Sequence, residues 1–263
     1  MDITLSVVIV EYKSIQEIQT CVASLKKHIG VPYEVIISSN SCYGEKQRKN
    51  IGKDADEHVR WLFNARNGGF AYAMNEGLKV ARGRYLAIMN PDCTLCSDIG
   101  PMIRFMDMHP EVGAIAPQMK DGGGNIQDTA RPYVTLSRYI IRQIKRIMYH
   151  KVSVLSDTMD YAAVQTVDWL IGAFIMISRK AYELTGGLDE GYFMYAEDLD
   201  WCTRIRRADL EVVYFPEVTI LYAGTRRART SSKYARIFIR SHIRYWNRFG
   251  YFFGHPKRKD LVF

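Results

Sequence analysis

The run Leu5-Ser6-Val7-Val8-Ile9-Val10 decides the fold class, because it is the first of several short apolar segments that alternate with helical patterns. Its nearly continuous, β-branched character is typical of a parallel strand buried on both faces. Apolar residues then recur every three or four positions from Ile15 to Ile29, which predicts an amphipathic helix. The alternation continues with predicted strands at 33–37, 61–63 and 85–89 and a helix at 71–81. We therefore expect an α/β fold whose mostly parallel central sheet is flanked by helices and binds ligands at the carboxyl ends of its strands.

The second half of the chain has less regular patterns. They predict strands at 112–116, 167–177 and 212–215, a flexible turn at 122–124, and helices at 136–150, 198–208 and 231–249. The sequence contains no internal repeat. A chain of 263 residues with 48% hydrophobic and 24% charged residues predicts one large core.

The net charge of +8 is concentrated near the end of the chain. Residues 226–259 contain 11 Lys or Arg and no acid, whereas residues 1–225 carry 25 basic and 27 acidic residues, a net charge of −2. This shift predicts a main domain over 1–225 and a basic, amphipathic helical extension over 226–263.

Three segments contain the residue types that nucleotide chemistry uses. Asn90-Pro91-Asp92 follows a predicted strand, where a carboxylate could hold a divalent ion that bridges two phosphates, although the triplet is also a good turn. Asn67-Gly68-Gly69, followed by Asn75, precedes a predicted helix whose amino terminus would suit a diphosphate, or forms an ordinary loop-to-helix junction. The sequence has no G-x-G-x-x-G and no P-loop pattern, which argues against dinucleotide and ATP-type sites.

The third segment is an acidic cluster, Glu197-Asp198-Leu199-Asp200, flanked by aromatic residues. Carboxylates in apolar surroundings are costly unless they are paired or used in chemistry. Capping of a helix could explain one of these acids, but it does not easily explain all three.

These segments, in this order, resemble glycosyltransferase family 2 with the GT-A fold, and particularly its bacterial rhamnosyltransferase-like branch. The resemblance covers nearly the whole chain, with matching segments at 7–12, 67–75, 85–92, 168–173 and 186–204. It implies an inverting hexosyltransferase of cell-envelope polysaccharide biosynthesis that transfers a sugar from a nucleotide-sugar donor to a hydroxyl of a lipid-linked or saccharide acceptor. The expected donor is dTDP-rhamnose, with another nucleotide sugar as the alternative. The alternative is a catalytically weak or inactive relative that binds a sugar nucleotide or a partner protein.

The resemblance also implies roles for individual residues. Asp92 is expected to bind Mg²⁺ or Mn²⁺, and Asp198 to act as the general base with Glu197 beside it. Donor-binding residues are expected to be Val10, Glu11, Tyr12, Ser38, Ser39, Asn67, Gly68, Gly69, Asn75, Asn90 and Asp92. Acceptor-binding residues are expected to be Trp169, Gly172, Ala173, Asp200 and Arg204.

The chain departs from the family pattern at two positions. Where family members usually carry an acid that reads the nucleotide base, this chain has Ser38 and Ser39. Hydroxyls hydrogen-bond a base more weakly than a carboxylate does. Where the family often has a metal-binding His, at the head of an H-x-x-G stretch, this chain has Leu221. These departures leave the selectivity for the base and the level of activity open.

The basic extension predicts a helix in which Arg236, Arg240, Arg244 and Arg248 repeat every four residues, roughly opposite Tyr234, Phe238, Tyr245 and Phe249. Basic and aromatic residues together suit an anionic membrane surface, whereas the aromatic face could equally pack on the core. No recognised nucleic-acid motif accompanies the basic run. Because the sequence shows no signal peptide and no long apolar run, we expect a cytoplasmic protein, peripheral on the inner face of the cell membrane. The five cysteines are expected to be free thiols, and the single C-x-x-C at Cys93 and Cys96 has no second pair that would complete a zinc site.

Overall fold

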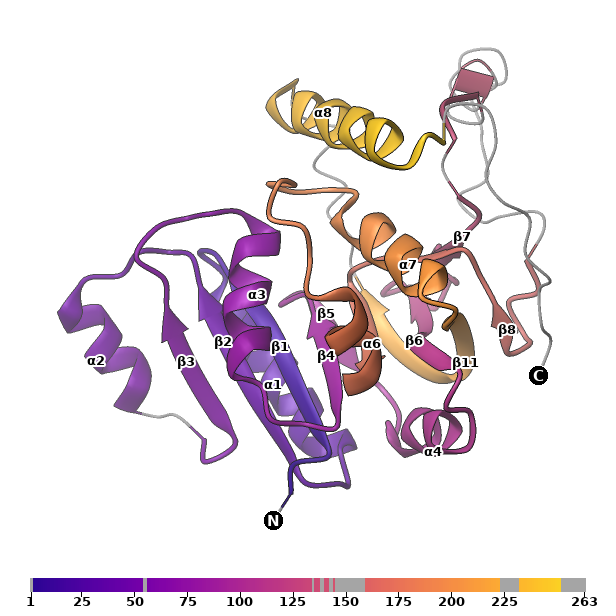
Figure 1. The fold of residues 1–263 in the computed structure, drawn as a ribbon. Coiled ribbons are helices and arrows are strands. Elements are labelled where there is room, and N and C mark those ends of the chain that lie inside the picture. Colours follow the sequence, from indigo (N-terminus) through magenta and orange to yellow (C-terminus); the bar gives the residue numbers. More distant parts are fainter. Residues whose placement is uncertain are drawn as a thin grey trace.

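The apolar run that begins the chain forms β1 (Leu5–Glu11), an inner strand of a mixed sheet (Figure 1). In this computed structural model the described residues are 2–53, 56–133, 135–137, 140, 141, 144, 159–222 and 232–251. β1 pairs in parallel with β2 (Tyr33–Ser39) and β4 (Tyr85–Met89), and β3 (Val59–Phe63) extends the sheet beyond β2. Every residue of β1, β2 and β4 is buried, as expected for strands that are covered on both faces.

The other half of the sheet is mixed in direction. β10 (Phe174–Ser178) runs antiparallel between β4 and β6 (Val112–Lys120), and β11 (Glu211–Tyr222) pairs in parallel with β6. The short strands β5 (Cys93–Leu95) and β8 (Gln165–Thr166) are both antiparallel to β11. The strand order is β3-β2-β1-β4-β10-β6-β11-β5, and β7 (Ala130–Arg131) pairs with β9 (Trp169–Leu170) in a separate ribbon.

Helices cover both faces of the sheet and divide the core in two. Residues of α3 (Phe70–Val80), α6 (Arg179–Thr185) and α7 (Glu197–Arg207) form one apolar cluster with residues such as Val8 of β1. Residues of α1 (Ile15–His28) and α4 (Gly100–Met108) form the other cluster with residues such as Val7. Successive side chains of one strand thus enter opposite cores, which is the period-two pattern of a strand. α2 (Glu45–Lys53) lies beside β3 (Figure 1).

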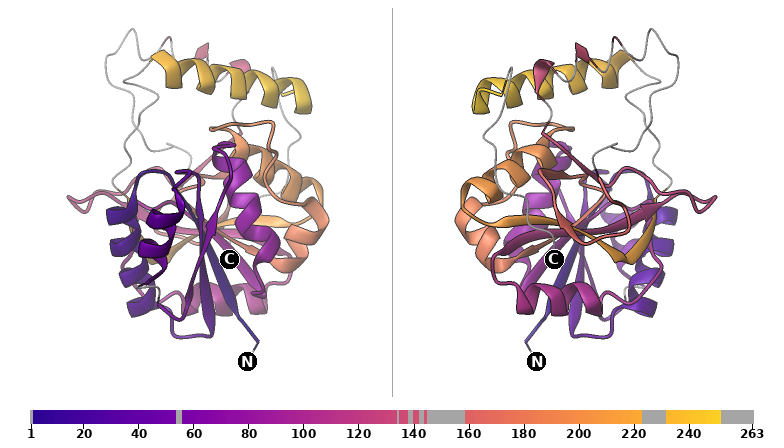
Figure 2. Two further views of the ribbon diagram at one scale, coloured as in Figure 1. Left: turned by 90° about the vertical axis from the view of Figure 1, so that its left-hand side faces the viewer. Right: turned by 90° about the vertical axis from the view of Figure 1, so that its right-hand side faces the viewer.

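The last described helix, α8 (Ser232–Phe249), lies across the end of the molecule toward which β1 runs (Figures 1 and 2). Its aromatic face packs inward, since Tyr245, Trp246 and Phe249 are all buried in the cluster that includes α7. Of the two alternatives for the aromatic face of this helix, contact with a membrane or packing on the core, the structure shows packing on the core for these three residues. Within the described residues, no helix is both long and apolar enough to cross a membrane.

The structure corrects several expected elements. The predicted strand at 167–177 is two strands, β9 and β10, separated by a turn at 171–173. Polar composition concealed α2, and the patterns also missed β5, α4 and α6. β6 and β11 extend well beyond their predicted ends because they pair with each other over their length. Most of the helix expected at 136–150 lies outside the described residues.

Candidate functional site

The carboxylate of Glu11 ends β1 and is fully buried beneath a group of hydroxyls. It accepts hydrogen bonds from the hydroxyls of Ser39 at 2.5 Å, Ser41 at 3.0 Å and Tyr43 at 3.1 Å, and from the Ser14 N–H at 3.0 Å. Glu11 and Ser39 are direct partners in the register of β1 and β2. Ser38 and Ser39 of β2 stand where the family usually has an acid, and the structure places the Glu11 carboxylate on the adjacent strand β1. This carboxylate holds the hydroxyls around it in place.

Three other residues of the expected donor side lie at the same end of the sheet. Ser38 is fully buried, and its oxygen accepts a hydrogen bond from the Asn64 amide at 3.0 Å. Val10 is buried, whereas 47% of the Tyr12 surface is exposed. Of these three side chains, only Tyr12 is therefore accessible to a ligand without rearrangement.

The glycine segment before α3 packs closely against a distant loop. Gly69 has φ of 95°, and a side chain there would approach the Phe193 carbonyl oxygen to 2.5 Å, so this position requires glycine. The first amide of α3, that of Phe70, donates to the same Phe193 oxygen at 2.9 Å. Asn67 accepts from the Gly69 N–H at 3.1 Å. One of the amides expected to bind a diphosphate is therefore already used to hold the segment that precedes the acidic cluster.

Asn75, also expected on the donor side, makes a second connection to that segment. Its amide donates to the Leu188 carbonyl at 2.8 Å and to Glu190 at 2.9 Å, and its oxygen accepts from the Leu188 N–H at 2.9 Å. These contacts give Asn75 a structural role, and its contact with a donor stays a prediction.

Asp92 lies in the turn between β4 and β5 and is partly exposed. The turn is fixed by the Asn90 N–H, which donates to Ala173 at 2.8 Å, and by the Cys93 N–H, which donates to Asn90 at 3.1 Å. Burial, and then the Asp92 charge, raise the pKa of the nearby Cys21 thiol to about 12. The Asp92 carboxylate therefore lies at the carboxyl end of β4, in a turn that joins Asn90, expected to bind the donor, to Ala173, expected to bind the acceptor. Its partial exposure makes it accessible to a ligand.

Tyr222 is a residue of this site that the sequence analysis missed. It lies opposite Cys93 in the pairing of β11 with β5, while the preceding Leu221 lies opposite Thr94 and is 39% exposed. Burial, followed by the charge of Asp92, raises the pKa of the Tyr222 phenol, and the charge of Asp198 acts in the same direction to a smaller extent. The Asn90 side chain acts in the opposite direction and lowers this pKa. Since alternate residues of a strand face opposite ways, Tyr222 rather than Leu221 faces the two carboxylates.

Glu197 and Asp198 begin α7, and both are buried. Asp198 accepts hydrogen bonds from the backbone N–H groups of Gly172 and Leu199, both at 2.8 Å. Burial raises the pKa of Asp198, and the two N–H groups oppose this effect. Burial, with the neighbouring Asp198 charge, raises the pKa of Glu197 well above its usual value, and its Oε2 has no hydrogen-bond partner among the described residues. When the pair carries one proton, the proton therefore resides on Glu197 and Asp198 is ionised.

Two of the expected acceptor-side residues, Trp169 and Gly172, lie beside Asp198. The turn that interrupts the predicted strand at 167–177 presents the Gly172 N–H to its carboxylate, and a side chain at Gly172 would approach the Asp198 Cβ to 3.2 Å. The Trp169 indole N–H is buried beside Asp198 without a well-formed hydrogen bond to a described residue, and it lowers the Asp198 pKa. Arg131 stacks over the Trp169 ring at 5.2 Å and also lowers that pKa through its charge.

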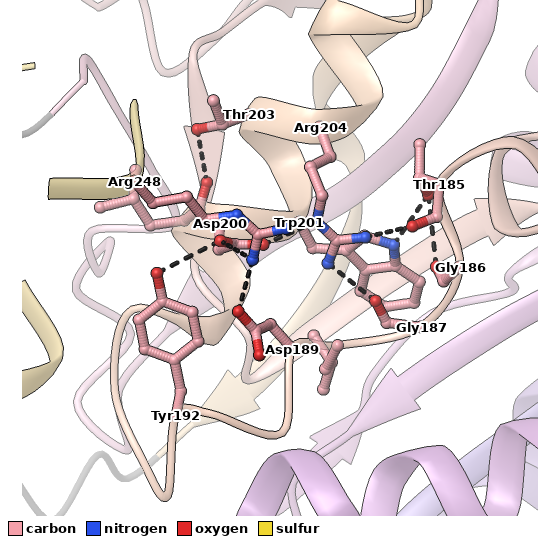
Figure 3. A network of polar contacts seen from close by, with 12 residues as sticks. Thr185, Gly186, Gly187, Asp189, Tyr192, Asp200, Trp201, Thr203, Arg204 and Arg248 are labelled. Atoms are coloured by element: carbon pink, nitrogen blue, oxygen red, sulfur yellow. Dashed lines mark hydrogen bonds and ion pairs between the residues drawn. The ribbon is translucent and has the colours of Figure 1, made fainter. Parts of the chain in front are cut away.

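Asp200 and Arg204 belong to a polar network that also includes Tyr192 and Arg248 (Figure 3). The Asp200 side chain is fully buried and accepts from Arg204 Nε at 2.6 Å, from the Tyr192 hydroxyl at 3.2 Å and from Arg248 of α8 at 2.9 Å. Arg204 also donates to backbone carbonyls of the 185–187 segment. The structure thus gives both residues structural partners, and their predicted contact with an acceptor stays untested.

The described residues contain no group of three or more His, Cys, Asp or Glu side chains that could hold a metal ion. The five cysteines are free, and two of them, Cys42 and Cys96, are exposed. Mg²⁺ and Mn²⁺ accept carboxylate and phosphate oxygens, and Mg²⁺ in particular is often bound through one or two carboxylates plus the phosphates of a substrate. The donor set around Asp92 therefore fits a cation shared with a diphosphate rather than one held by the protein alone.

Comparison with known families and proteins gives consistent matches. The model of the family described as Glycosyl transferase family 2 matches residues 6–183, from β1 into α6. Rhamnosyltransferase WbbL of Escherichia coli (strain K12) is 26% identical over 231 residues, covering 82% of this chain and 83% of the relative. The N-acetylglucosaminyl-diphospho-decaprenol L-rhamnosyltransferase of Mycobacterium tuberculosis is 24% identical over 233 residues, covering 83% and 75% of the two chains.

Solved structures share the fold at low sequence identity. GalNAc-T7, solved with UDP, GalNAc and Mn²⁺, has a TM-score of 0.65 and 16% identity, covering 93% of this chain and 48% of that one. The mannosyltransferase PcManGT of Pyrobaculum calidifontis, solved with GDP-Man and Mn²⁺, has a TM-score of 0.56 and 16% identity, covering 85% and 57%. This chain therefore spans about half the length of these structures, and the likeness confirms the expected GT-A fold.

Proposed function

Because the chain belongs to glycosyl transferase family 2 and resembles its rhamnosyltransferases, we propose that it is an inverting, metal-dependent glycosyltransferase. The proposed donor is dTDP-rhamnose, and the proposed acceptor is a hydroxyl of a lipid-linked or polysaccharide substrate in cell-surface glycan synthesis. Relatives named as rhamnosyltransferases support the donor, and a relative whose name includes a diphospho-decaprenol supports the lipid-linked acceptor.

The observation that carries this proposal is the different hydrogen bonding of the two acids in the pair. Asp198 receives two backbone N–H groups, whereas Glu197 leaves one buried oxygen without a partner. Ionised Asp198 is therefore the group able to accept a proton, at a pKa raised toward neutral pH, as a general base requires. A protonated Glu197 is neutral and so places no second negative charge next to the Asp198 carboxylate.

The proposed step is a single displacement. Asp198 removes the proton of the acceptor hydroxyl as the acceptor oxygen attacks the anomeric carbon and the bond from that carbon to the diphosphate breaks, which inverts the configuration. The backbone N–H groups of Gly172 and Leu199 orient the carboxylate during this step. Mg²⁺ or Mn²⁺, held by Asp92 together with the diphosphate, would stabilise the charge on the departing nucleotide.

The test is a panel of TDP-, UDP- and GDP-sugars, each assayed for binding and for hydrolysis with and without Mg²⁺ or Mn²⁺. We expect metal-dependent binding and slow hydrolysis of at least one donor, with dTDP-rhamnose preferred. Binding without hydrolysis or transfer would favour the alternative of an inactive relative. The absence of binding to every donor would overturn the proposal.

We further propose that the outward face of α8 contacts an anionic membrane, at the inner face of the cell membrane. α8 contains no Asp or Glu. Its exposed positions include Lys233, Arg236 and Arg240 beside Ile239 and Ile243, which are about half exposed. Each basic residue near such a surface contributes about 1 kcal/mol, and apolar residues between them can enter the headgroup region.

The described part of the 136–144 segment lies at the same end of the molecule as α8 (Figures 1 and 2) and carries three more isoleucines, Ile140, Ile141 and Ile144, that are about half exposed. The test is sedimentation with phosphatidylglycerol vesicles at low salt. We expect Arg236→Glu with Arg240→Glu to weaken sedimentation and Arg104→Glu, on α4, to leave it unchanged. Equal sedimentation of the double variant and the unaltered chain would refute the membrane contact.

A further inference from the structure

The backbone immediately before the acidic pair is strained. Tyr195 and Ala196 have φ of 71° and 65°, in the left-handed region that residues with side chains avoid. This conformation is unfavourable for residues with side chains, so two in succession persist only where neighbouring contacts hold them. Because Glu197 follows directly, the direction in which α7 and its carboxylates leave this segment depends on those contacts.

Helix α8 contacts the strained pair and the residues that precede it. The Ser241 hydroxyl donates to the Met194 carbonyl at 2.8 Å, and the Phe238 ring packs edge-on against the Tyr195 ring at 5.7 Å. Earlier in the segment, the Arg244 guanidinium lies so close to Gly191 that a side chain there would approach it to 2.2 Å. The segment therefore fits against α8 along most of its length.

Two arginines of α8, Arg244 and Arg248, bind carboxylates at the start of this segment and in the helix that follows it, and Figure 3 shows the contacts of Arg248. Arg244 donates to Asp189 at 2.9 Å, and Arg248 forms an ion pair with the same carboxylate. Arg248 also donates at 2.9 Å to Asp200, which is fully buried in the first turn of α7. Arg248 thus connects the start of the segment to the turn that carries Asp198.

We propose that α8 positions the base, with Arg244 and Arg248 acting as positioning residues that hold the 189–196 segment and the first turn of α7. The inference rests on the proposed role of Asp198. In this arrangement the four arginines that repeat every four residues along α8 have two different roles. Arg236 and Arg240 face outward, whereas Arg244 and Arg248 bind the core. Without Arg248, Asp200 keeps Arg204 and Tyr192, so α7 should remain folded while the segment before it loosens.

The experiment compares Arg248→Met and Arg244→Met with the control Arg84→Met. The control also removes an ion pair, with Asp107, but Arg84 precedes β4 and so lies at the end of that strand opposite to Asp92. Three quantities are measured for each variant: binding of TDP and UDP with Mn²⁺, kcat and KM with the preferred nucleotide sugar, and amide hydrogen exchange of peptides from 189–199. A misplacement of about 1 Å can cost roughly 10²-fold in rate. We expect Arg248→Met to lower kcat at least tenfold with nucleotide binding unchanged, and Arg248→Lys to restore part of the loss.

The exchange measurement separates this inference from the proposed function. We expect faster exchange at 189–199 in Arg248→Met but not in Arg84→Met. Unchanged exchange there would overturn the inference whatever the turnover, and so would faster exchange with an unaltered kcat. Absence of turnover by the unaltered chain with every donor would instead overturn the proposed function, and the role in positioning a base with it.

Discussion

The two carboxylates proposed to do the chemistry lie in contrasting regions of the molecule. Asp92 follows β4 in the regular, parallel half of the sheet, in a turn that leaves it partly exposed. Asp198 begins α7 in the mixed half, where it is buried and accepts two backbone N–H groups. A group that must meet a hydrated cation and a diphosphate needs access, whereas a base needs a fixed direction and a raised pKa. Each environment suits the proposed role of its carboxylate.

The two regions also differ in what holds them. On the Asp92 side, regular strand pairing places the residues. On the Asp198 side, a strained segment, a turn at Gly172 and a helix from the end of the chain are all required. We therefore expect substitutions far along the chain to affect the base more than the metal acid.

The sharpest test of the contrast is Asp198→Asn. Asparagine keeps the shape but cannot take the proton, so we expect turnover to fall about 10²–10⁴-fold. The measurement is initial rate with the preferred nucleotide sugar, with nucleotide binding and thermal unfolding as controls. Turnover near that of the unaltered chain would show that Asp198 is not the base.

Asp92→Asn should lower turnover and also remove the Mn²⁺ dependence of nucleotide binding. Stabilisation of charge by a metal ion is worth several kcal/mol, so a loss of about 10²-fold or more in turnover is expected. Unlike Asp198→Asn, this variant should also lose the Mn²⁺ dependence of nucleotide binding, measured by calorimetry with and without the metal. If both variants lost metal-dependent binding equally, the division into two roles would fail.

Arg131→Met should change the pH dependence of turnover rather than its maximum. The raised pKa of Asp198 predicts that activity falls as pH drops through a value above the usual aspartate range. Arg131 lowers that pKa, so its removal should move the acidic limb of the kcat profile to higher pH. A shift of the limb in the opposite direction would contradict the assigned electrostatics.

Glu197→Gln should have a smaller effect than Asp198→Asn, although the two residues are neighbours. Glutamine imitates the protonated acid, which is the form that burial favours by raising the pKa of Glu197. We expect it to retain most of the turnover at the pH optimum. A loss as large as that of Asp198→Asn would exchange the roles of the two acids.

His242 of α8 should influence stability without changing turnover near neutral pH. Burial lowers its pKa from 6.5 to about 4, so the unfolded chain binds a proton more readily than the folded chain. Its contribution is therefore fully present above pH 6.5 and is lost as pH falls toward about 4. Urea unfolding at pH 7 and pH 5 should show a smaller decrease for His242→Gln than for the unaltered chain. An equal decrease in both would rule out this contribution.

Periodicity in the sequence determined much of the fold. The apolar runs at 5–10, 33–37 and 85–89 predict the parallel strands, because a strand covered on both faces must be apolar throughout. The acidic cluster at 197–200 also stands out, because carboxylates among aromatic residues are costly unless they are paired or used, whereas Asn90-Pro91-Asp92 by itself is also a good turn. The family resemblance then assigned expected roles to them.

Only the tertiary structure decided how these residues are supported. Contacts between distant segments place Tyr222 rather than Leu221 near both carboxylates, interrupt the strand expected at 167–177 at Gly172, and bring Arg248 of α8 to Asp200. None of these has a local signature, because strand register and helix docking depend on the packing of the whole chain. The sequence by itself determined which acids this protein presents, and the docking of β11 and α8 decided what surrounds them.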